Sequence, residues 1–344
     1  MDNTKDQKMP RFKKYGIYLA LLFVLITIIS LVCSNDYKAT LSKDLNVPAN
    51  FVYNAINNLE TQKDWNNMAI NDTSFNLIFS GKTFGKEASC DFTSSKYGNG
   101  VIKIIEAYQN DSIFLESRTN EESVISYKYY LTTLDSTTVN LRVEGLGNVG
   151  FIKNIVSFFY KWKLKRQLDK SITKLEELMN NRYVEKIYRG YKIKQENIGP
   201  KFYIYNRAEV EFNNIDQYYT QNISALYQTA IKENVTIPGP PCGLFFNWDK
   251  TNKKTDMAAA LPTLAELRFV NTGTISIPAK MALIIEFVGD RNKSKNAHNA
   301  MDDFILDHKL KNDAPVIEEY VTDPTAEPDM SKWITNILYY VSYK

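Results

Sequence analysis

The chain has 344 residues, enough for about two domains of ordinary size. Its 42 Lys and Arg residues exceed the 39 Asp and Glu residues by three, and the first fourteen residues hold this whole excess, since five of them are basic and two are acidic. The remaining chain is formally neutral, which gives no electrostatic support for nucleic-acid binding. An apolar content of 44% with 13% aromatic residues excludes a disordered or low-complexity chain.

Histidine and cysteine are scarce, which limits the chemistry that the chain can perform. Only His298 and His308 are available for a zinc site or a Ser-His-Asp triad, and neither lies in a recognisable motif. The cysteines Cys33, Cys90 and Cys242 show no zinc spacing, although one Cys90–Cys242 disulfide stays open. We therefore expect no cofactor and no bound metal.

Residues 1–14 are predicted to form a basic cytoplasmic tail and residues 15–33 a transmembrane helix. The segment from Tyr15 to Cys33 contains no charged residue and, as a helix, matches the thickness of a bilayer. Because the cations precede it, the positive-inside rule predicts a single-pass membrane protein with a cytoplasmic amino terminus and its body on the other side. A cleaved signal peptide is the alternative, but its apolar region is normally only about 7–15 residues long.

Residues 36–182 are predicted to fold as one α+β domain. A strand near Lys38–Leu45 and a helix that starts after Pro48 precede six strand candidates, which turns separate as antiparallel hairpins require. These candidates are Phe75–Phe79, Lys86–Thr93, Val101–Tyr108, Ser112–Ser117, Val124–Thr132 and Thr138–Glu144. A long amphipathic helix over about Phe151–Met179 closes the domain.

The order of these elements resembles the START/polyketide-cyclase-like (SRPBCC) superfamily. The sequence VPANFV at 47–52 and Trp65 beyond it are similar to the opening of that family's domain. The resemblance implies a helix-grip fold, in which a curved antiparallel sheet grips the long carboxyl-terminal helix around an apolar cavity. It also implies binding of lipids or other hydrophobic small molecules, and a role as spacer or partner surface is the alternative.

Residues 185–344 contain an internal repeat. The segment 241–249 aligns with 315–323, at an offset of 315 − 241 = 74 residues; each copy follows an amphipathic helix and is succeeded by another strand. With the leading strands Phe202–Phe212 and Ala279–Val288, the pattern predicts β-α-β-β twice. Two such units side by side predict a continuous antiparallel sheet with both helices on one face.

This half of the chain resembles the gyrase-inhibitor-like (GyrI-like) effector-binding domain, which follows DNA-binding domains in bacterial AraC- and MerR-type regulators. The resemblance rests on GPP and FNWD within 239–249, TDMAA at 255–259, and EEYVTDP and KW within 318–333. It implies a groove between the two repeats that binds amphipathic or cationic small molecules around a buried glutamate, which the motif assigns to Glu318. After Gly289 the family usually has an aromatic residue in a short turn, whereas this chain continues with Asp290-Arg291-Asn292.

Strand geometry points to the same glutamate. Because side chains alternate along a strand, Glu318 and Tyr320 share one face. The repeat then predicts Leu244, Phe246 and Trp248 on the equivalent face of the first copy. An acid among aromatic rings attracts a lipophilic cation, so the predicted ligand-binding residues are Glu318, Tyr320, Phe246, Trp248, Leu244 and Trp333. The alternative is that the aromatic residues are core and that Glu318 pairs with a lysine.

Two functions fit these patterns best. The first is a membrane-anchored sensor or carrier of hydrophobic or cationic small molecules, which has no DNA-binding domain of its own and binds no nucleic acid. The second is a hydrolase of reactive small molecules, with Glu318 as general base and Tyr320 as proton donor. A scaffold that contacts other envelope proteins is a third interpretation.

Overall fold

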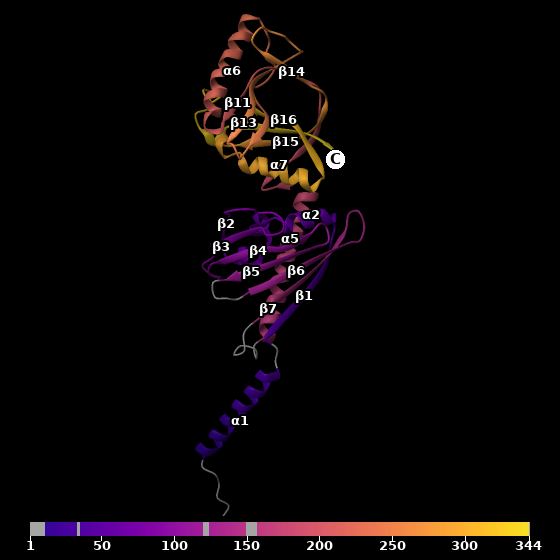
Figure 1. Cartoon of the computed structure of the whole chain (residues 1–344), viewed down its shortest axis with the longest axis vertical. Coiled ribbons are helices and arrows are strands. Elements are labelled where there is room, and N and C mark those ends of the chain that lie inside the picture. The colour runs from indigo at the N-terminus through magenta and orange to yellow at the C-terminus, as the bar shows by residue number, and fades with distance from the viewer. Residues whose placement is uncertain (1–10, 33–34, 120–123, 149–156, 344) are drawn as a thin grey trace, which may run out of the picture. The chain divides into compact units, whose positions relative to one another are not determined.

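The computed structural model describes residues 11–32, 35–119, 124–148 and 157–343 (Figure 1). The chain divides into two compact units, Met1–Asn180 and Asn181–Lys344. Each unit combines α-helices with antiparallel strands, so the predicted α+β class is confirmed.

Helix α1 (Arg11–Val32) comes before the first strand. A helix that crosses a bilayer needs about 20 consecutive apolar residues. Of the helices within the described ranges, none is long and apolar enough to cross a membrane. The predicted transmembrane helix over residues 15–33 and the predicted single-pass membrane location are therefore wrong. Residues 1–10 of the predicted tail, and Cys33, lie outside the described residues.

The first unit is built on a seven-stranded antiparallel sheet with the order β1-β7-β6-β5-β4-β3-β2. Its strands are β1 (Asp36–Leu45), β2 (Asn76–Ile78), β3 (Ser89–Thr93), β4 (Gly100–Tyr108), β5 (Ser112–Thr119), β6 (Val124–Thr133) and β7 (Val139–Asn148). Its helices are α2 (Ala49–Ile56), the 3-10 helix η1 (Leu59–Thr61), α3 (Gln62–Trp65), α4 (Asn67–Asn71) and α5 (Ser157–Tyr183). The predicted strands of this unit are thus present, and the predicted start of the last helix at Phe151 lies outside the described residues.

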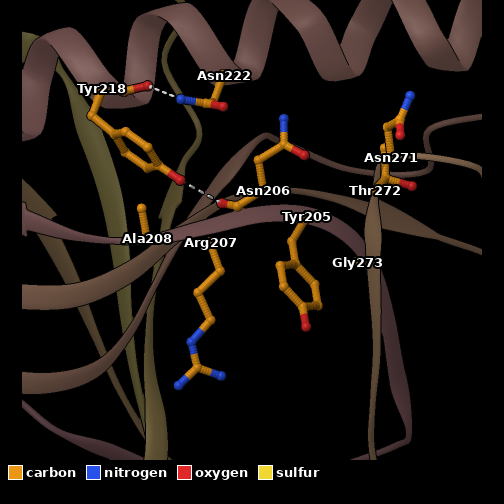
Figure 2. A pocket seen from close by; sticks show the side chains of 9 residues that line it. All are labelled: Tyr205, Asn206, Arg207, Ala208, Tyr218, Asn222, Asn271, Thr272 and Gly273. Atoms are coloured by element: carbon orange, nitrogen blue, oxygen red, sulfur yellow. Dashed lines mark hydrogen bonds between the residues drawn. The ribbon is translucent and has the colours of Figure 1, made fainter.

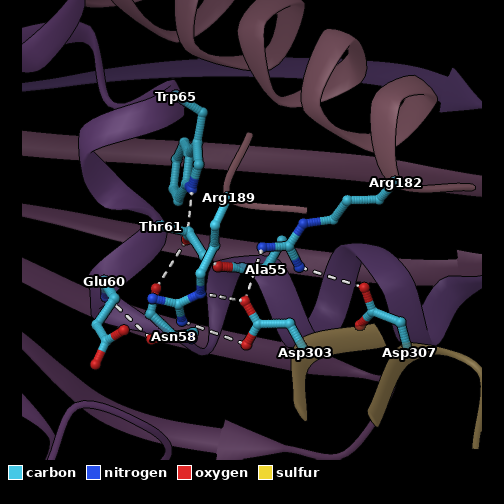
Figure 3. Close-up of polar contacts among 9 residues, drawn as sticks. All are labelled: Ala55, Asn58, Glu60, Thr61, Trp65, Arg182, Arg189, Asp303 and Asp307. Atoms are coloured by element: carbon cyan, nitrogen blue, oxygen red, sulfur yellow. Dashed lines mark hydrogen bonds and ion pairs between the residues drawn. The ribbon is translucent and has the colours of Figure 1, made fainter. Parts of the chain in front are cut away.

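Helix α5 packs on this sheet through an apolar stripe of buried residues: Leu164, Leu168, Ile172, Leu175 and Met179. Gly145 on β7 permits the close approach, because a Cβ there would lie 2.9 Å from the Leu164 side chain. Before the meander, the buried Trp65 indole donates to the Thr61 hydroxyl at 3.0 Å, and this hydroxyl donates to the Ala55 carbonyl at 2.6 Å (Figure 3). Membership of the SRPBCC superfamily stays a prediction.

The second unit contains an eight-stranded antiparallel sheet with the order β10-β15-β17-β16-β12-β13-β11-β14. Its strands are β10 (Lys194–Ile198), β11 (Lys201–Glu211), β12 (Cys242–Asp249), β13 (Lys254–Thr263), β14 (Gly273–Ile277), β15 (Lys280–Val288), β16 (Leu310–Tyr320) and β17 (Ile334–Tyr343), and a separate pair is β8 (Ile187–Tyr188) and β9 (Tyr191–Lys192). Its helices are α6 (Ile215–Lys232) and α7 (Lys295–Asp307), with the 3-10 helices η3 (Phe212–Asn214), η4 (Arg291–Lys293) and η5 (Met330–Lys332). The order β11-α6-β12-β13 followed by β15-α7-β16-β17 confirms the predicted repeat.

Helices α6 and α7 cover the same face of this sheet, as predicted. Leu226 of α6 packs with Ala259 of β13, and Met301 of α7 packs with Ile337 of β17. Residues that lie opposite one another in antiparallel strands point to the same face. The register places the following residues opposite one another in turn across the sheet: Ile285, Ile337, Glu318, Gly243 and Ala259.

Two arginines hold α7 in place through buried ion pairs (Figure 3). Arg182 Nη1 lies 3.3 Å from Asp307 Oδ2, and Arg189 Nε donates to Asp303 Oδ2 at 2.8 Å. The side chains of Arg182 and Asp307 are only 5% and 1% exposed. Removing either one would leave the other charge buried with weakened compensation.

The two cysteines that the structure describes are both free and buried. Cys90 belongs to β3 and Cys242 to β12. Burial raises the pKa of both thiols, so they remain protonated. The Cys90–Cys242 disulfide that the sequence leaves open is not formed.

Candidate ligand site

The two copies of the repeat meet at β12 and β16, the central strands of the second sheet. Gly243 of β12 lies opposite Glu318 of β16, and both belong to the face that the helices cover. Because α6 comes from one copy and α7 from the other, side chains of both copies converge here. We call this group of residues the seam: Tyr219, Gly243, Arg291, His298, Glu318, Tyr320 and Trp333.

Glu318 is the carboxylate of the seam, and its side chain is 13% exposed. Its Oε1 lies 2.9 Å from His298 Nε2 on α7, and its Oε2 accepts a hydrogen bond of 3.0 Å from the Tyr320 hydroxyl. Each carboxylate oxygen thus has a protein partner, as a partly buried charge requires.

His298 links Glu318 to a second tyrosine. Its Nδ1 lies 3.1 Å from the Tyr339 hydroxyl. A neutral imidazole with its proton on Nε2 satisfies both contacts, since Nε2–H donates to Glu318 and Nδ1 accepts from Tyr339. Burial, followed by the charge of Glu318, raises the pKa of Tyr320 well above its ordinary value. The Tyr320 hydroxyl therefore stays protonated and remains a hydrogen-bond donor.

Aromatic rings and one cation surround the Tyr320 side chain. Tyr219 of α6 meets the Tyr320 ring edge-on, with ring centres 4.8 Å apart. The Arg291 guanidinium carbon lies 4.2 Å from the centre of the Tyr320 ring and 5.1 Å from that of Trp333. The Trp333 indole is fixed by donating to the Glu327 carbonyl at 2.8 Å. These faces and the guanidinium form a cation–π arrangement inside the protein.

Gly243 makes room for Tyr320. A Cβ at position 243 would lie only 2.8 Å from the Tyr320 hydroxyl oxygen and 2.9 Å from the Phe245 ring. The lack of a side chain at position 243 therefore leaves space for the Tyr320 hydroxyl, which donates to Glu318.

Three of the six predicted ligand-binding residues lie at the seam, namely Glu318, Tyr320 and Trp333. Trp248 shares their face but lies against Phe212 at a ring distance of 4.3 Å, and it is 48% exposed. Leu244 is completely buried on the opposite face, where it lies opposite Ile317. The alternative, in which Glu318 pairs with a lysine, is not what the structure has, because Glu318 contacts His298.

Phe246 also differs from the predicted face. It packs with the core cluster of the opposite face, and the Arg207 guanidinium lies 3.6 Å from its ring centre. The copies match in side-chain direction only at an odd offset such as 75, which matches Gly243 with Glu318, so Leu244 and Phe246 point to the other face. A bulge between Phe245 and Asn247 then shifts the register again, which returns Trp248 to the predicted face.

Sequence reasoning missed four residues of the seam: Tyr219, Gly243, Arg291 and His298. His298 was visible as a polar residue beside the apolar positions of a predicted amphipathic helix. Arg291 was visible as a departure from the aromatic residue that the GyrI-like turn usually carries. Neither signal gives a distance to Glu318, because each residue reaches β16 only through the tertiary fold.

Two grooves of the second unit lie elsewhere. One has a volume of about 540 Å³ (Figure 2) and is lined by Tyr205, Asn206, Arg207, Ala208, Tyr218, Asn222, Asn271, Thr272 and Gly273. A second of about 470 Å³ is lined by Glu211, Phe212, Asn213, Asn252 and Lys253. Arg207 of the first groove is already paired with Asp256, through two hydrogen bonds of 2.6 and 2.8 Å. The seam itself is filled by its own side chains, since Tyr320 is only 8% exposed.

Within the part of the chain that the structure describes, no group of three or more His, Cys, Asp and Glu side chains is placed to hold a metal ion. Glu318 and His298 are two such ligands without a third. The seam offers hydrogen bonding, charge attraction and contact with aromatic faces.

No family model matches the chain, and no curated protein matches it. Among solved structures, the EcmrR C-terminal domain is 19% identical and aligns over 45% of this chain and 99% of its own, with a TM-score of 0.40. Protein CV1439 from Chromobacterium violaceum is 15% identical over 42% of this chain and 97% of its own, with a TM-score of 0.33. SAV2435 bound to tetraphenylphosphonium is 14% identical over 44% of this chain and 94% of its own, with a TM-score of 0.33.

Proposed function

We propose that the second unit binds a small hydrophobic or cationic molecule at the seam, and that the protein acts as a sensor or carrier of such molecules. The observation that carries this proposal is the Glu318 carboxylate, which is partly buried at the centre of the sheet and surrounded by aromatic side chains. Even a paired buried charge adds little net stability, so a ligand explains the position of Glu318 better than stability does.

The contacts of the seam favour a cation as that molecule. Glu318 supplies negative charge, and the ring faces of Tyr320 and Trp333 supply the negative side of their quadrupoles. Arg291 already rests on both faces, which indicates that a positive group is stable there. The assignment of residues 36–182 to lipid binding and the absence of nucleic-acid binding remain predictions.

Titration calorimetry with tetraphenylphosphonium, the molecule held by SAV2435, tests the proposal. The Glu318→Gln variant should bind about tenfold more weakly than the unmodified chain, a loss of about 1.4 kcal/mol. Glu319→Gln is the matched control, because Glu319 is the next residue, points to the opposite face and pairs with Lys201. Equal affinity in the unmodified chain and in Glu318→Gln would reject the seam as the site.

A hydrolase is the second candidate, and one contact favours it. The Tyr320 hydroxyl donates to Glu318 at 3.0 Å, so a general base and a proton donor lie side by side. Incubation with reactive electrophiles separates the two functions. Turnover that disappears in Glu318→Gln would support the hydrolase, whereas saturable binding without turnover supports the sensor or carrier.

A further inference from the structure

Arg291 fills the place in the seam that a cationic ligand would need. Its guanidinium rests on the rings of Tyr320 and Trp333, at 4.2 and 5.1 Å. Its Nη2 donates to the Thr322 carbonyl at 3.2 Å. The seam is therefore closed by a planar cation that belongs to the chain itself.

The contacts that hold Arg291 are few. In the described residues its Nε is buried without a hydrogen-bond partner, and no ion pair includes its guanidinium. Its backbone belongs to the three-residue helix η4, whose other members, Asn292 and Lys293, are exposed. An unpartnered buried donor is unfavourable, so releasing Arg291 to water recovers part of the free energy lost with the stacking.

We propose that the seam takes a planar delocalised cation, such as an aryl guanidinium or amidinium, and that Arg291 is the intramolecular competitor which this ligand displaces. The inference rests on the proposed function of the seam. A planar cation of this kind reproduces each contact that Arg291 makes: stacking on Tyr320 and Trp333, and donation to the Thr322 carbonyl.

Competition follows from charge and space. Two cations cannot share the same ring faces, because like charges repel strongly in a partly buried site. The apparent affinity for the ligand is then reduced by the fraction of molecules in which Arg291 occupies the seam. An Arg291 side chain that is bound nine-tenths of the time reduces it about tenfold.

Calorimetry with phenylguanidinium and its neutral isostere phenylurea tests the inference. Arg291→Ala and Arg291→Gln should each bind phenylguanidinium about tenfold more tightly than the unmodified chain. Phenylurea, which carries no charge, should bind each of these variants more weakly than phenylguanidinium does. Lys293→Ala is the matched control, since it removes an exposed cation from the same helix η4 without touching the rings, and it should leave both affinities unchanged. Thermal unfolding of each variant verifies that it is folded.

The outcomes separate this inference from the proposed function. Unchanged or weaker phenylguanidinium binding in both Arg291 variants overturns the inference. Phenylurea that binds these variants as tightly as phenylguanidinium also overturns it, because the site would then have no preference for a charged ligand. If tetraphenylphosphonium still binds in a Glu318-dependent way, the inference fails alone. If neither cation binds any variant, the proposed function fails with it.

Discussion

The two copies of the β-α-β-β repeat have the same frame but place different side chains on the helix-covered face. In the second copy, β16 carries Glu318 and Tyr320, and α7 adds His298. In the first copy, the matching positions on β12 are Gly243 and Phe245, which carry no hydrogen-bonding side chain. The site is therefore asymmetric, because one copy supplies the polar groups and the other supplies space.

This difference indicates how a duplicated fold can acquire a single site. The strands β12 and β16 are adjacent, so a large side chain on one of them needs a small residue beside it on the other. Gly243 meets that need for Tyr320, and Tyr219 of α6 closes the side that belongs to the first copy. A substitution that adds a side chain at Gly243, or removes the polar groups of the second copy, should therefore disturb the candidate site.

The largest expected effect comes from removing the buried ion pair between Arg182 and Asp307, the last residue of α7. Asp307→Ala leaves Arg182 buried with Asp303 as its remaining partner, at 3.7 Å. We expect a loss of about 3 kcal/mol in the free energy of unfolding, measured by urea denaturation of the full chain. The control is Asp216→Ala on α6, an exposed acid that should change the value by no more than about 0.5 kcal/mol. Similar values for both variants would contradict the comparison.

A smaller effect is expected when the first copy is given a side chain. In Gly243→Ala the new methyl group would lie 2.8 Å from the Tyr320 hydroxyl oxygen, so the ring must move away from Glu318. We expect a loss of about 2 kcal/mol in urea denaturation. Gly199→Ala is the control, because nothing lies within 4 Å of its added Cβ. A Gly243→Ala variant as stable as this control would show that the close approach does not matter.

The smallest effect concerns a single hydroxyl of the second copy. Tyr320→Phe removes the hydrogen bond to Glu318 and should cost about 1 kcal/mol in thermal or urea unfolding. Tyr340→Phe serves as control, since its buried hydroxyl has no hydrogen-bond partner among the described residues and its removal should be neutral or stabilising. Equal losses in the two variants would contradict the assigned contact.

Much of the second unit could be predicted from sequence, because the repeat and its amphipathic helices are local patterns. The order of strands and helices follows from them, and so does the common face of α6 and α7. The offset of 74 was one residue short of an offset that keeps side-chain direction, and this shift turned Leu244 to the wrong face. The bulge after Phe245 could not be seen at all, because it depends on pairing with β13.

The candidate site was predictable only in part. Glu318 and Tyr320 lie two residues apart on one strand, and alternation is enough to bring them together. His298 and Arg291 come from other elements, and their contacts depend on how α7 and η4 pack over β16. The amino-terminal prediction failed for another reason. It was drawn from the uncharged run and the cations that precede it, whereas no described helix is long and apolar enough to cross a membrane.

The position of a bound cation tests the central claim most directly. A crystal structure of the protein with tetraphenylphosphonium should place the ligand against Tyr320 and Trp333, with Arg291 moved off both rings. Ligand found instead in the groove beside Tyr205 and Tyr218, with the seam unchanged, would contradict the claim.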